Sequence, residues 1–188
     1  MKLLSAISAG AFALLVLTGA ASAQTGATEA KRIGDFVVRC IPVQNASPCD
    51  MFEEVANKDT GQRYVTMSIA YVPSADRYIM VVSVPLGVLI EKGAEIQTNA
   101  VSTGAMPIRR CDRTGCFVEV GVAKAVIDNF AKATGEGKIK MVGDDDKPYE
   151  FPLRFNGFAE AHTYMVEQNR AKARAPSAAP AAAAPTAQ

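Results

Sequence analysis

The sequence YVTMSIAYV, residues 64–72, places a large apolar side chain at every second position from Val65 to Tyr71. A period of two puts alternate side chains on opposite faces of a β-strand, so these apolar residues share one face. Pro73 then closes the pattern, because proline cannot continue the hydrogen-bonding of a strand. We therefore predict a β-strand here and work outward from it to the rest of the fold.

Segments of the same kind lie on both sides of this strand. Residues 78–84 are apolar and end at Pro85. Further strands are predicted at 33–40, 95–98, 108–110, 116–120, 138–142 and 149–155. Two segments, 122–133 and 158–170, instead carry apolar residues at helical spacing. Many short strands with frequent proline and glycine turns favour a β-sandwich or a related barrel over alternating βαβ units, so we predict a mainly β fold with two accessory helices.

The N-terminal segment 1–23 has the pattern of a secretory signal peptide. Lys2 precedes an apolar run over 3–17, and Ala21-Ser22-Ala23 offers small residues to a signal peptidase, which would leave Gln24 as the mature N-terminus. The apolar run is shorter than the roughly 20 residues of a membrane-spanning helix, and no later segment reaches that length. We predict an exported protein with no transmembrane span after cleavage.

The rest of the chain divides into three parts. Residues 24–32 form a lead-in, 33–170 form a folded domain of a size that one hydrophobic core supports, and 171–188 form a tail rich in alanine and proline. Repeated proline interrupts any alanine-driven helix, and few large apolar side chains are available to bury. The tail is therefore predicted to be disordered, either as a tether or as a spacer that presents the domain to a partner.

Four cysteines follow the leader, at Cys40, Cys49, Cys111 and Cys116. Export to an oxidising compartment favours disulfides over metal or redox chemistry. Four cysteines allow three pairings, and we expect the local one, 40 with 49 and 111 with 116, because these partners are close along the chain. Structural zinc is the alternative, but only the second pair has a spacing near that of zinc knuckles. We predict no metal.

The charge balance and the motifs of the chain argue against nucleic-acid binding and enzymatic activity. Loss of Lys2 from the 20 basic residues leaves a balance with the 19 acidic ones, whereas a nucleic-acid binder normally has a basic excess on one face. The chain has one histidine, His162, and neither an H-E-x-x-H nor a G-x-S-x-G motif. A lone histidine on a predicted helix is more often a packing residue than a base or ligand. We therefore predict no nucleic-acid partner, no enzymatic activity and no cofactor.

Three arginines surround the second cysteine pair, at Arg109, Arg110 and Arg113. A guanidinium group presents a fixed fork of donors that suits a carboxylate or a phosphate. These arginines are our candidate binding residues for an anionic group. The alternative is that they pair with Glu119 or face solvent.

Several ordered blocks of sequence occur together: GDFVVRC at 34–40, CDM at 49–51, VPLGV at 84–88, PIRRC at 107–111, GCFVEV at 115–120 and GF at 157–158. In this combination the chain resembles the invasion associated locus B family of exported bacterial proteins. The resemblance runs from about residue 33 to the end of the last predicted helix. One departure is Phe36, where the family pattern favours tryptophan.

This resemblance implies a single-domain, immunoglobulin-like β-sandwich in the envelope of a Gram-negative bacterium, associated with host-cell invasion. It supplies no reaction and no catalytic residues. We therefore expect a non-enzymatic protein that acts through contacts with a protein partner in the envelope or on a host cell. Its expected location is the periplasm, with association with the outer membrane or the cell surface as alternatives. A periplasmic small-ligand-binding or accessory module is the alternative function.

Overall fold

The computed structural model describes residues 28–41 and 45–174. The predicted signal peptide and most of the predicted tail lie outside these ranges. Within them the chain forms ten β-strands, two α-helices and two short 3₁₀ helices, η1 (Pro73–Ala75) and η2 (Ile90–Lys92). The prediction of a mainly β fold with two helices is confirmed.

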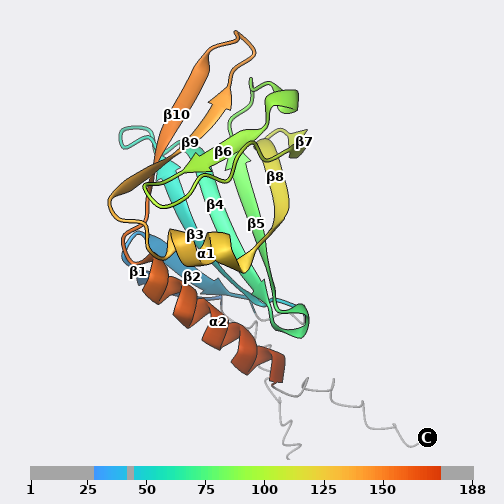
Figure 1. Ribbon diagram of the computed structural model, residues 1–188, viewed down its shortest axis with the longest axis vertical. Coiled ribbons are helices and arrows are strands. Elements are labelled where there is room, and N and C mark those ends of the chain that lie inside the picture. Colours follow the sequence, from blue (N-terminus) through green and yellow to red (C-terminus); the bar gives the residue numbers. More distant parts are fainter. Residues whose placement is uncertain (1–27, 42–44, 175–188) are drawn as a thin grey trace, which may run out of the picture.

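Seven of the described strands form one antiparallel sheet (Figure 1). In spatial order they are β1 (Glu29–Ile33), β2 (Phe36–Cys40), β3 (Cys49–Ala56), β4 (Arg63–Val72), β5 (Arg77–Val84), β8 (Gly115–Val122) and β7 (Ile108–Asp112). The first five are consecutive in sequence as well as in space. Antiparallel neighbours need only short connections, which is why the turn residues between these segments are sufficient.

Strand β4 lies in the middle of this sheet, between β3 and β5. Its side chains Met67 and Ile69 are buried, whereas Thr66 and Ser68 between them are partly exposed. The predicted alternation is confirmed. It defines an inner face of the larger sheet, which carries the buried residues, and an outer face, which carries Thr66 and Ser68.

The smaller sheet has the order β10 (Pro148–Arg154), β9 (Glu136–Val142) and β6 (Ala94–Gln97). Ile96 and Ile139 of this sheet are buried in the same core as the inner face of β4. At its end, β10 meets β3 directly, because the backbone N–H of Arg154 donates a hydrogen bond to the Glu53 carboxylate at 2.8 Å. The smaller sheet thus covers part of the inner face.

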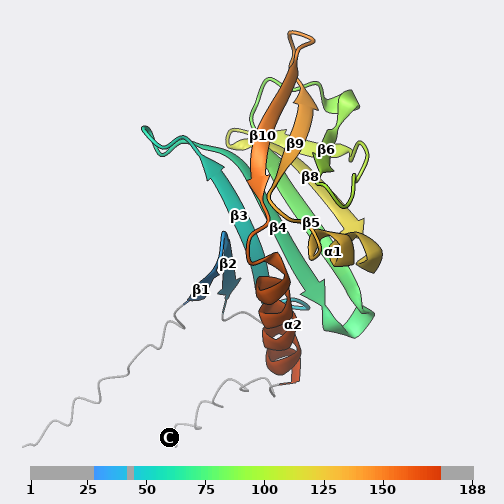
Figure 2. The ribbon, with the colours of Figure 1, turned by 60° about the vertical axis from the view of Figure 1, so that its left-hand side comes forward.

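The helices α1 (Lys124–Phe130) and α2 (Phe158–Arg174) lie on this same face of the larger sheet (Figure 2). Helix α2 packs against β2, β3 and β4 and buries Phe158, Ala161 and Met165, which recur at the spacing of one helix face. No helix in the described ranges is long and apolar enough to span a bilayer.

Aromatic side chains fill the junction between the helices and the larger sheet. Phe36, Phe130, Phe155 and Phe158 are all buried. The ring of Phe36 meets that of Phe158 edge-on, with centroids 5.3 Å apart, and Phe130 lies 5.3 Å from Phe155. Phe36, at the position where the family pattern favours tryptophan, is therefore fully buried and packed in the core.

Element boundaries differ from the prediction in several places. The predicted strand 33–40 is two strands, because Gly34 takes a φ of +59° and starts a turn. A side chain at Gly34 would collide with the carbonyl oxygen of Asn156, so only glycine fits. The resulting β1 begins at Glu29, inside the predicted lead-in. Helix α1 is shorter than 122–133, and α2 continues past Arg170 to Arg174, into the predicted tail.

Strand β3 was not predicted at all. Its sequence CDMFEEVA places the acidic Glu53 on the inner face, which breaks the apolar alternation. The observed division is seven strands against three, whereas an immunoglobulin constant-type domain divides seven strands four against three. The topology therefore shows antiparallel sheets and a mainly β fold, and the immunoglobulin-like sandwich stays a prediction.

Candidate functional site

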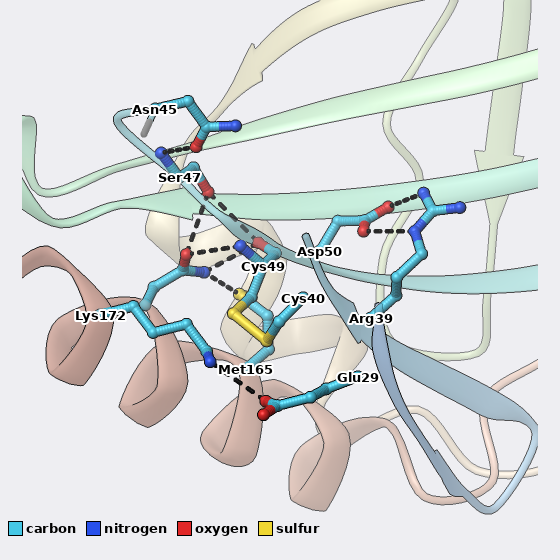
Figure 3. The surroundings of a disulfide bond; sticks show 10 residues. Glu29, Arg39, Cys40, Asn45, Ser47, Cys49, Asp50, Met165 and Lys172 are labelled. Carbon is cyan, nitrogen blue, oxygen red and sulfur yellow. Dashed lines mark hydrogen bonds and ion pairs between the residues drawn. A yellow bond between two sulfur atoms is a disulfide. The ribbon is translucent and has the colours of Figure 1, made fainter. Parts of the chain in front are cut away.

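The first disulfide joins Cys40 and Cys49, which face each other across β2 and β3 (Figure 3). Asn169 of α2 is fully buried beside it. The N–H of Cys49 donates to the side-chain oxygen of Asn169, and the side-chain amide of Asn169 donates back to the carbonyl oxygen of Cys49, both at 2.9 Å. The disulfide, the sheet and α2 therefore form one connected unit.

The second disulfide joins Cys111 and Cys116, which face each other across β7 and β8. The predicted local pairing is confirmed for both bonds. In the turn between these cysteines, Asp112 accepts hydrogen bonds from the hydroxyl and the N–H of Thr114, at 2.6 and 2.7 Å. These bonds hold the pKa of the Asp112 carboxyl below its usual value. Cys111 is exposed, so this disulfide lies at an open edge of the sheet.

Arg110 is engaged by side chains of its own hairpin. Its guanidinium lies 3.9 Å from the centre of the Phe117 ring. It donates hydrogen bonds to Glu119 at 3.1 Å and to Asp112 at 2.8 Å. The alternative in which an arginine pairs with Glu119 therefore holds for this residue.

The other two candidate arginines lie apart from it. The register of β7 and β8 pairs Ile108 with Val118 but Arg110 with Phe117, so Arg109 sits in a β-bulge without a partner residue. It is exposed. Arg113 is also exposed, at the tip of the hairpin, and lines the second of the two surface depressions described next.

A shallow groove of about 460 Å³ crosses the outer face of the larger sheet. We call it the outer-face groove, lined by Arg39, Asp50, Phe52, Ser68 and Phe117 among others. Arg39 donates two hydrogen bonds to Asp50, at 3.1 and 2.8 Å, and the Ser68 hydroxyl donates a third at 2.8 Å. The Arg39 guanidinium also lies 4.9 Å from the Phe52 ring centre. The polar groups of the groove are thus held in place before any partner binds.

A second depression, of about 550 Å³, adjoins the groove between the β3–β4 turn, the segment after β5 and the β9–β10 hairpin. We call it the arginine–aromatic cleft. Its lining includes Arg63, Tyr64, Leu86, Arg113 and Tyr149. This size is within the range of natural ligand pockets.

A β-bulge positions Tyr64 at this cleft. Val55 pairs with Val65 but Ala56 pairs with Arg63, so Tyr64 has no opposite residue in the ladder. A bulge re-aims a side chain, and here the Tyr64 ring stacks on Phe151 of β10, with centroids 5.4 Å apart. This stack joins the larger sheet to the β9–β10 hairpin at the wall of the cleft.

Among the described residues, the buried carboxyl group of the inner face is that of Glu53, which is 1% exposed. Burial raises its pKa from 4.5 to about 7, against the opposing effect of hydrogen bonds from Arg154. The Arg154 guanidinium Nε lies 3.5 Å from Glu53 and 3.6 Å from Asp35. Glu53 therefore connects the two sheets.

His162 lies within the packing of α2. Its Nε2 atom is 2.9 Å from the hydroxyl of Tyr78, and its ring stacks on Phe158. Burial lowers the pKa of His162 below its usual value. In the described part of the chain, no three histidine, cysteine, aspartate or glutamate side chains gather where they could hold a metal ion.

Comparison with known proteins identifies the family. A family model described as invasion associated locus B (IalB) protein matches residues 37–166. The chain belongs to this family. The sequence-based recognition of invasion associated locus B is therefore confirmed.

A solved structure of similar fold is described as the crystal structure of invasion associated protein B from Bartonella henselae. It has a TM-score of 0.66 and 20% sequence identity, and the match covers 76% of this chain and 99% of that chain. At this identity the likeness shows a shared fold. No curated protein matches this chain in sequence.

The sequence pattern does not predict the roles of Asn169 and Glu53 or the bulge at Tyr64. Asn169 is one polar residue in a helix rich in them, and nothing in its neighbourhood marks it as buried. Arg113, a candidate binding residue from the sequence, lines the arginine–aromatic cleft, but the apolar residues beside it come from segments distant in sequence. Only the fold brings Leu86 and Tyr149 to the same cleft.

Proposed function

We propose that this chain is a non-enzymatic exported protein of a Gram-negative envelope, and that it supports host-cell invasion or envelope fitness through protein contacts. Family membership supports the association with invasion. The predicted signal peptide and the two disulfides support export to an oxidising compartment. On this proposal the leader is cleaved after Ala23, and the segment beyond Arg174 tethers the domain or presents it to a partner.

The outer-face groove is the observation that carries the proposal. The helices and the smaller sheet of the described residues all lie on the opposite face (Figure 2). Two arginine–aromatic stacks, Arg39 on Phe52 and Arg110 on Phe117, stand on the outer face. Arginine and aromatic residues are enriched at protein interfaces, and side chains held by existing hydrogen bonds lose less freedom on binding. The face is therefore suited to a protein partner.

Site-specific photo-cross-linking in intact cells tests this proposal. A photoreactive amino acid at Thr66, in the groove, is compared with one at Glu167, an exposed position on α2. We expect a discrete cross-linked protein adduct from position 66 and none from position 167. Absence of an adduct at 66, or the same adducts from both positions, would contradict the proposal.

The compartment is tested by protease treatment of intact cells that produce a tail-tagged chain, with a known periplasmic protein as the control for lysis. We propose a periplasmic location, which predicts protection until the outer membrane is permeabilised. Digestion of the chain while the control survives would place it at the cell surface and make direct host contact the leading interpretation.

The alternative function, small-ligand binding, has one observation in its favour. Arg113 lines a cleft and makes no hydrogen bond or ion pair within the described ranges. A carboxylate or phosphate would satisfy its donors. Calorimetric titration with inorganic phosphate tests this alternative, which predicts binding to the parent chain and loss of binding in Arg113→Ala.

A further inference from the structure

We propose that the arginine–aromatic cleft binds an extended peptide segment of the partner protein, in which a carboxylate stands next to a large apolar side chain. The inference rests on the proposed function, because it names the chemistry of the partner that the outer face is proposed to bind. It is carried by the apolar wall of the cleft, by its charge, by its rigid construction and by its continuity with the outer-face groove.

The apolar wall consists of side chains that are unusually exposed for their type. Leu86 is 56% exposed and Tyr149 is 44% exposed, and both line the cleft. The stacked rings of Tyr64 and Phe151 lie beside them. Large apolar side chains gathered at one depression mark a binding surface more strongly than the same residues scattered singly.

The charge of the cleft favours an acidic occupant. Its charged lining consists of Arg63, Arg113 and Asp144. Arg113 makes no hydrogen bond or ion pair within the part of the chain described, and the side chain of Arg63 is 68% exposed, with only a 3.4 Å ion pair to Glu54. Glu54 offsets the charge of Arg63, so the positive group open to an occupant is the guanidinium of Arg113, whose donors are available for a carboxylate.

The walls of the cleft are fastened to each other. The N–H of Asp144 donates to the carbonyl oxygen of Gly87 at 3.0 Å, Val88 bridges to Gly143, and the N–H of Leu89 donates to Val142 at 2.8 Å. These bonds tie the segment after β5 to the β9–β10 hairpin. A preformed cleft binds with less loss of conformational freedom than a mobile one.

Continuity with the outer-face groove favours a peptide over a small anion. Arg63, Tyr64, Pro85 and Thr114 line both depressions, so the cleft opens into the groove. An extended chain can follow this path from one depression to the other. The backbones of β4 and β5 beneath it are already paired on both sides, so recognition here depends on side chains, without addition of a strand.

Fluorescence anisotropy on the mature chain tests the inference. The probe is a fluorescein-labelled peptide of glycine and serine with aspartate and phenylalanine adjacent at its centre. Two control peptides replace the aspartate with lysine or the phenylalanine with serine. We expect saturable binding of the aspartate–phenylalanine peptide. Either replacement should weaken the affinity about tenfold, and added salt should weaken the affinity of the aspartate–phenylalanine peptide.

Matched variants locate the binding site. Arg113→Glu is expected to weaken binding of the aspartate–phenylalanine peptide about tenfold or more, whereas Arg109→Glu, the same change in the exposed bulge outside the cleft, leaves it within about twofold. Leu86→Ser is expected to weaken binding, whereas Ile90→Ser, at another exposed apolar residue that does not line the cleft, leaves it unchanged.

Three results would overturn the inference: no binding of the peptide, equal binding of the lysine-containing control, or equal loss in Arg113→Glu and Arg109→Glu. Binding of N-acetyl-aspartate amide as tight as that of the peptide would indicate a small-anion site and would also overturn it. The cross-linking at Thr66 separates the two proposals. A discrete adduct there together with no peptide binding would leave the proposed function standing and remove only this partner chemistry.

Discussion

The two faces of the seven-stranded sheet use polar side chains in opposite ways. On the inner face, Glu53 and Asn169 are buried and reach across to another element, from β3 to β10 and from α2 to β3. On the outer face, the Arg39–Asp50 pair connects two neighbouring strands and stays partly exposed. The polar groups of the inner face hold elements together, while those of the outer face remain accessible to a partner.

This difference has an energetic basis. A buried polar group that loses its partner has no water to replace it, whereas an exposed group is solvated at once. Changes on the inner face should therefore lower the free energy of unfolding strongly. Changes on the outer face should alter binding and leave stability nearly unchanged.

The largest effect is expected from Asn169→Ala. The substitution removes the acceptor of the Cys49 N–H and one of the two donors to the Cys49 carbonyl oxygen, which keeps the Ser47 hydroxyl at 3.3 Å. The loss of these two buried hydrogen bonds, together with the cavity left by the side chain, should lower the free energy of unfolding by about 4 kcal/mol, measured by urea denaturation. Glu167→Ala, on the exposed side of the same helix, is the control and should change it by less than about 0.5 kcal/mol. Equal effects of the two variants would contradict the connection through Asn169.

The next largest effect is expected from removal of the disulfides. Replacement of Cys40 and Cys49 by alanine should cost about 3 kcal/mol, and replacement of Cys111 and Cys116 about 2 kcal/mol, measured by the same denaturation. The first pair closes the longer loop, with a separation of 9 residues against 5, and also lies under the Asn169 contact. If removal of the Cys111–Cys116 bond lowered the free energy of unfolding more, the contact of α2 with the Cys40–Cys49 region would not contribute to stability.

Glu53→Gln tests the buried carboxyl group through pH. The pKa of Glu53 is raised from 4.5 to about 7. At pH values between these two, the Glu53 carboxyl group holds a proton in the folded protein and has lost it in the unfolded chain. Unfolding then releases a proton, and the contribution of Glu53 to stability falls as the pH rises. Between about pH 5 and about pH 7, this contribution should decrease by about 2 kcal/mol.

The measurement is the difference in unfolding free energy between the parent chain and Glu53→Gln at each pH, because the difference cancels the titration of other groups. The control is Glu54→Gln, the next residue, which points to the outer face and pairs with Arg63. The Glu53→Gln difference should fall more steeply over this range than the Glu54→Gln difference. A flat difference for Glu53→Gln would mean that the carboxyl group is ionised throughout.

The sequence predicts the inner and outer faces of β4 because its alternation is uninterrupted over 64–72. It also predicts the disulfide pairing, since the partners are close along the chain. It fails at β3, where Glu53 occupies an inner position that apolar patterning reserves for a hydrophobic residue. The carboxylate is accepted there only because Arg154, about a hundred positions later in the chain, supplies its hydrogen bonds.

The candidate site is less predictable than the fold, because its residues, like Glu53 and Arg154, come together from segments that are distant in sequence. Arg113 and Leu86 are individually unremarkable in sequence, and no local pattern shows that the fold places them at one cleft. The bulge at Tyr64 depends on a register shift between β3 and β4, which periodicity alone cannot locate. Sites made from loops of several hairpins become visible only when the strand order is known.

The smallest effect on stability is expected from Arg39→Ala on the outer face. The side chains of this pair are 46% and 22% exposed, and partly exposed ion pairs contribute about 1 kcal/mol or less. The variant should therefore unfold within about 1 kcal/mol of the parent chain. It should nevertheless lose the cross-linked adduct at Thr66, because the stack on Phe52 is removed and Asp50 keeps only one of its three hydrogen bonds in the groove. Lys138→Ala is a matched control: it breaks a similarly exposed pair with Glu150, outside the groove, and should keep the adduct. If Arg39→Ala lowers stability as much as Asn169→Ala, or keeps the adduct unchanged, the outer face is structural and the division between the two faces does not hold.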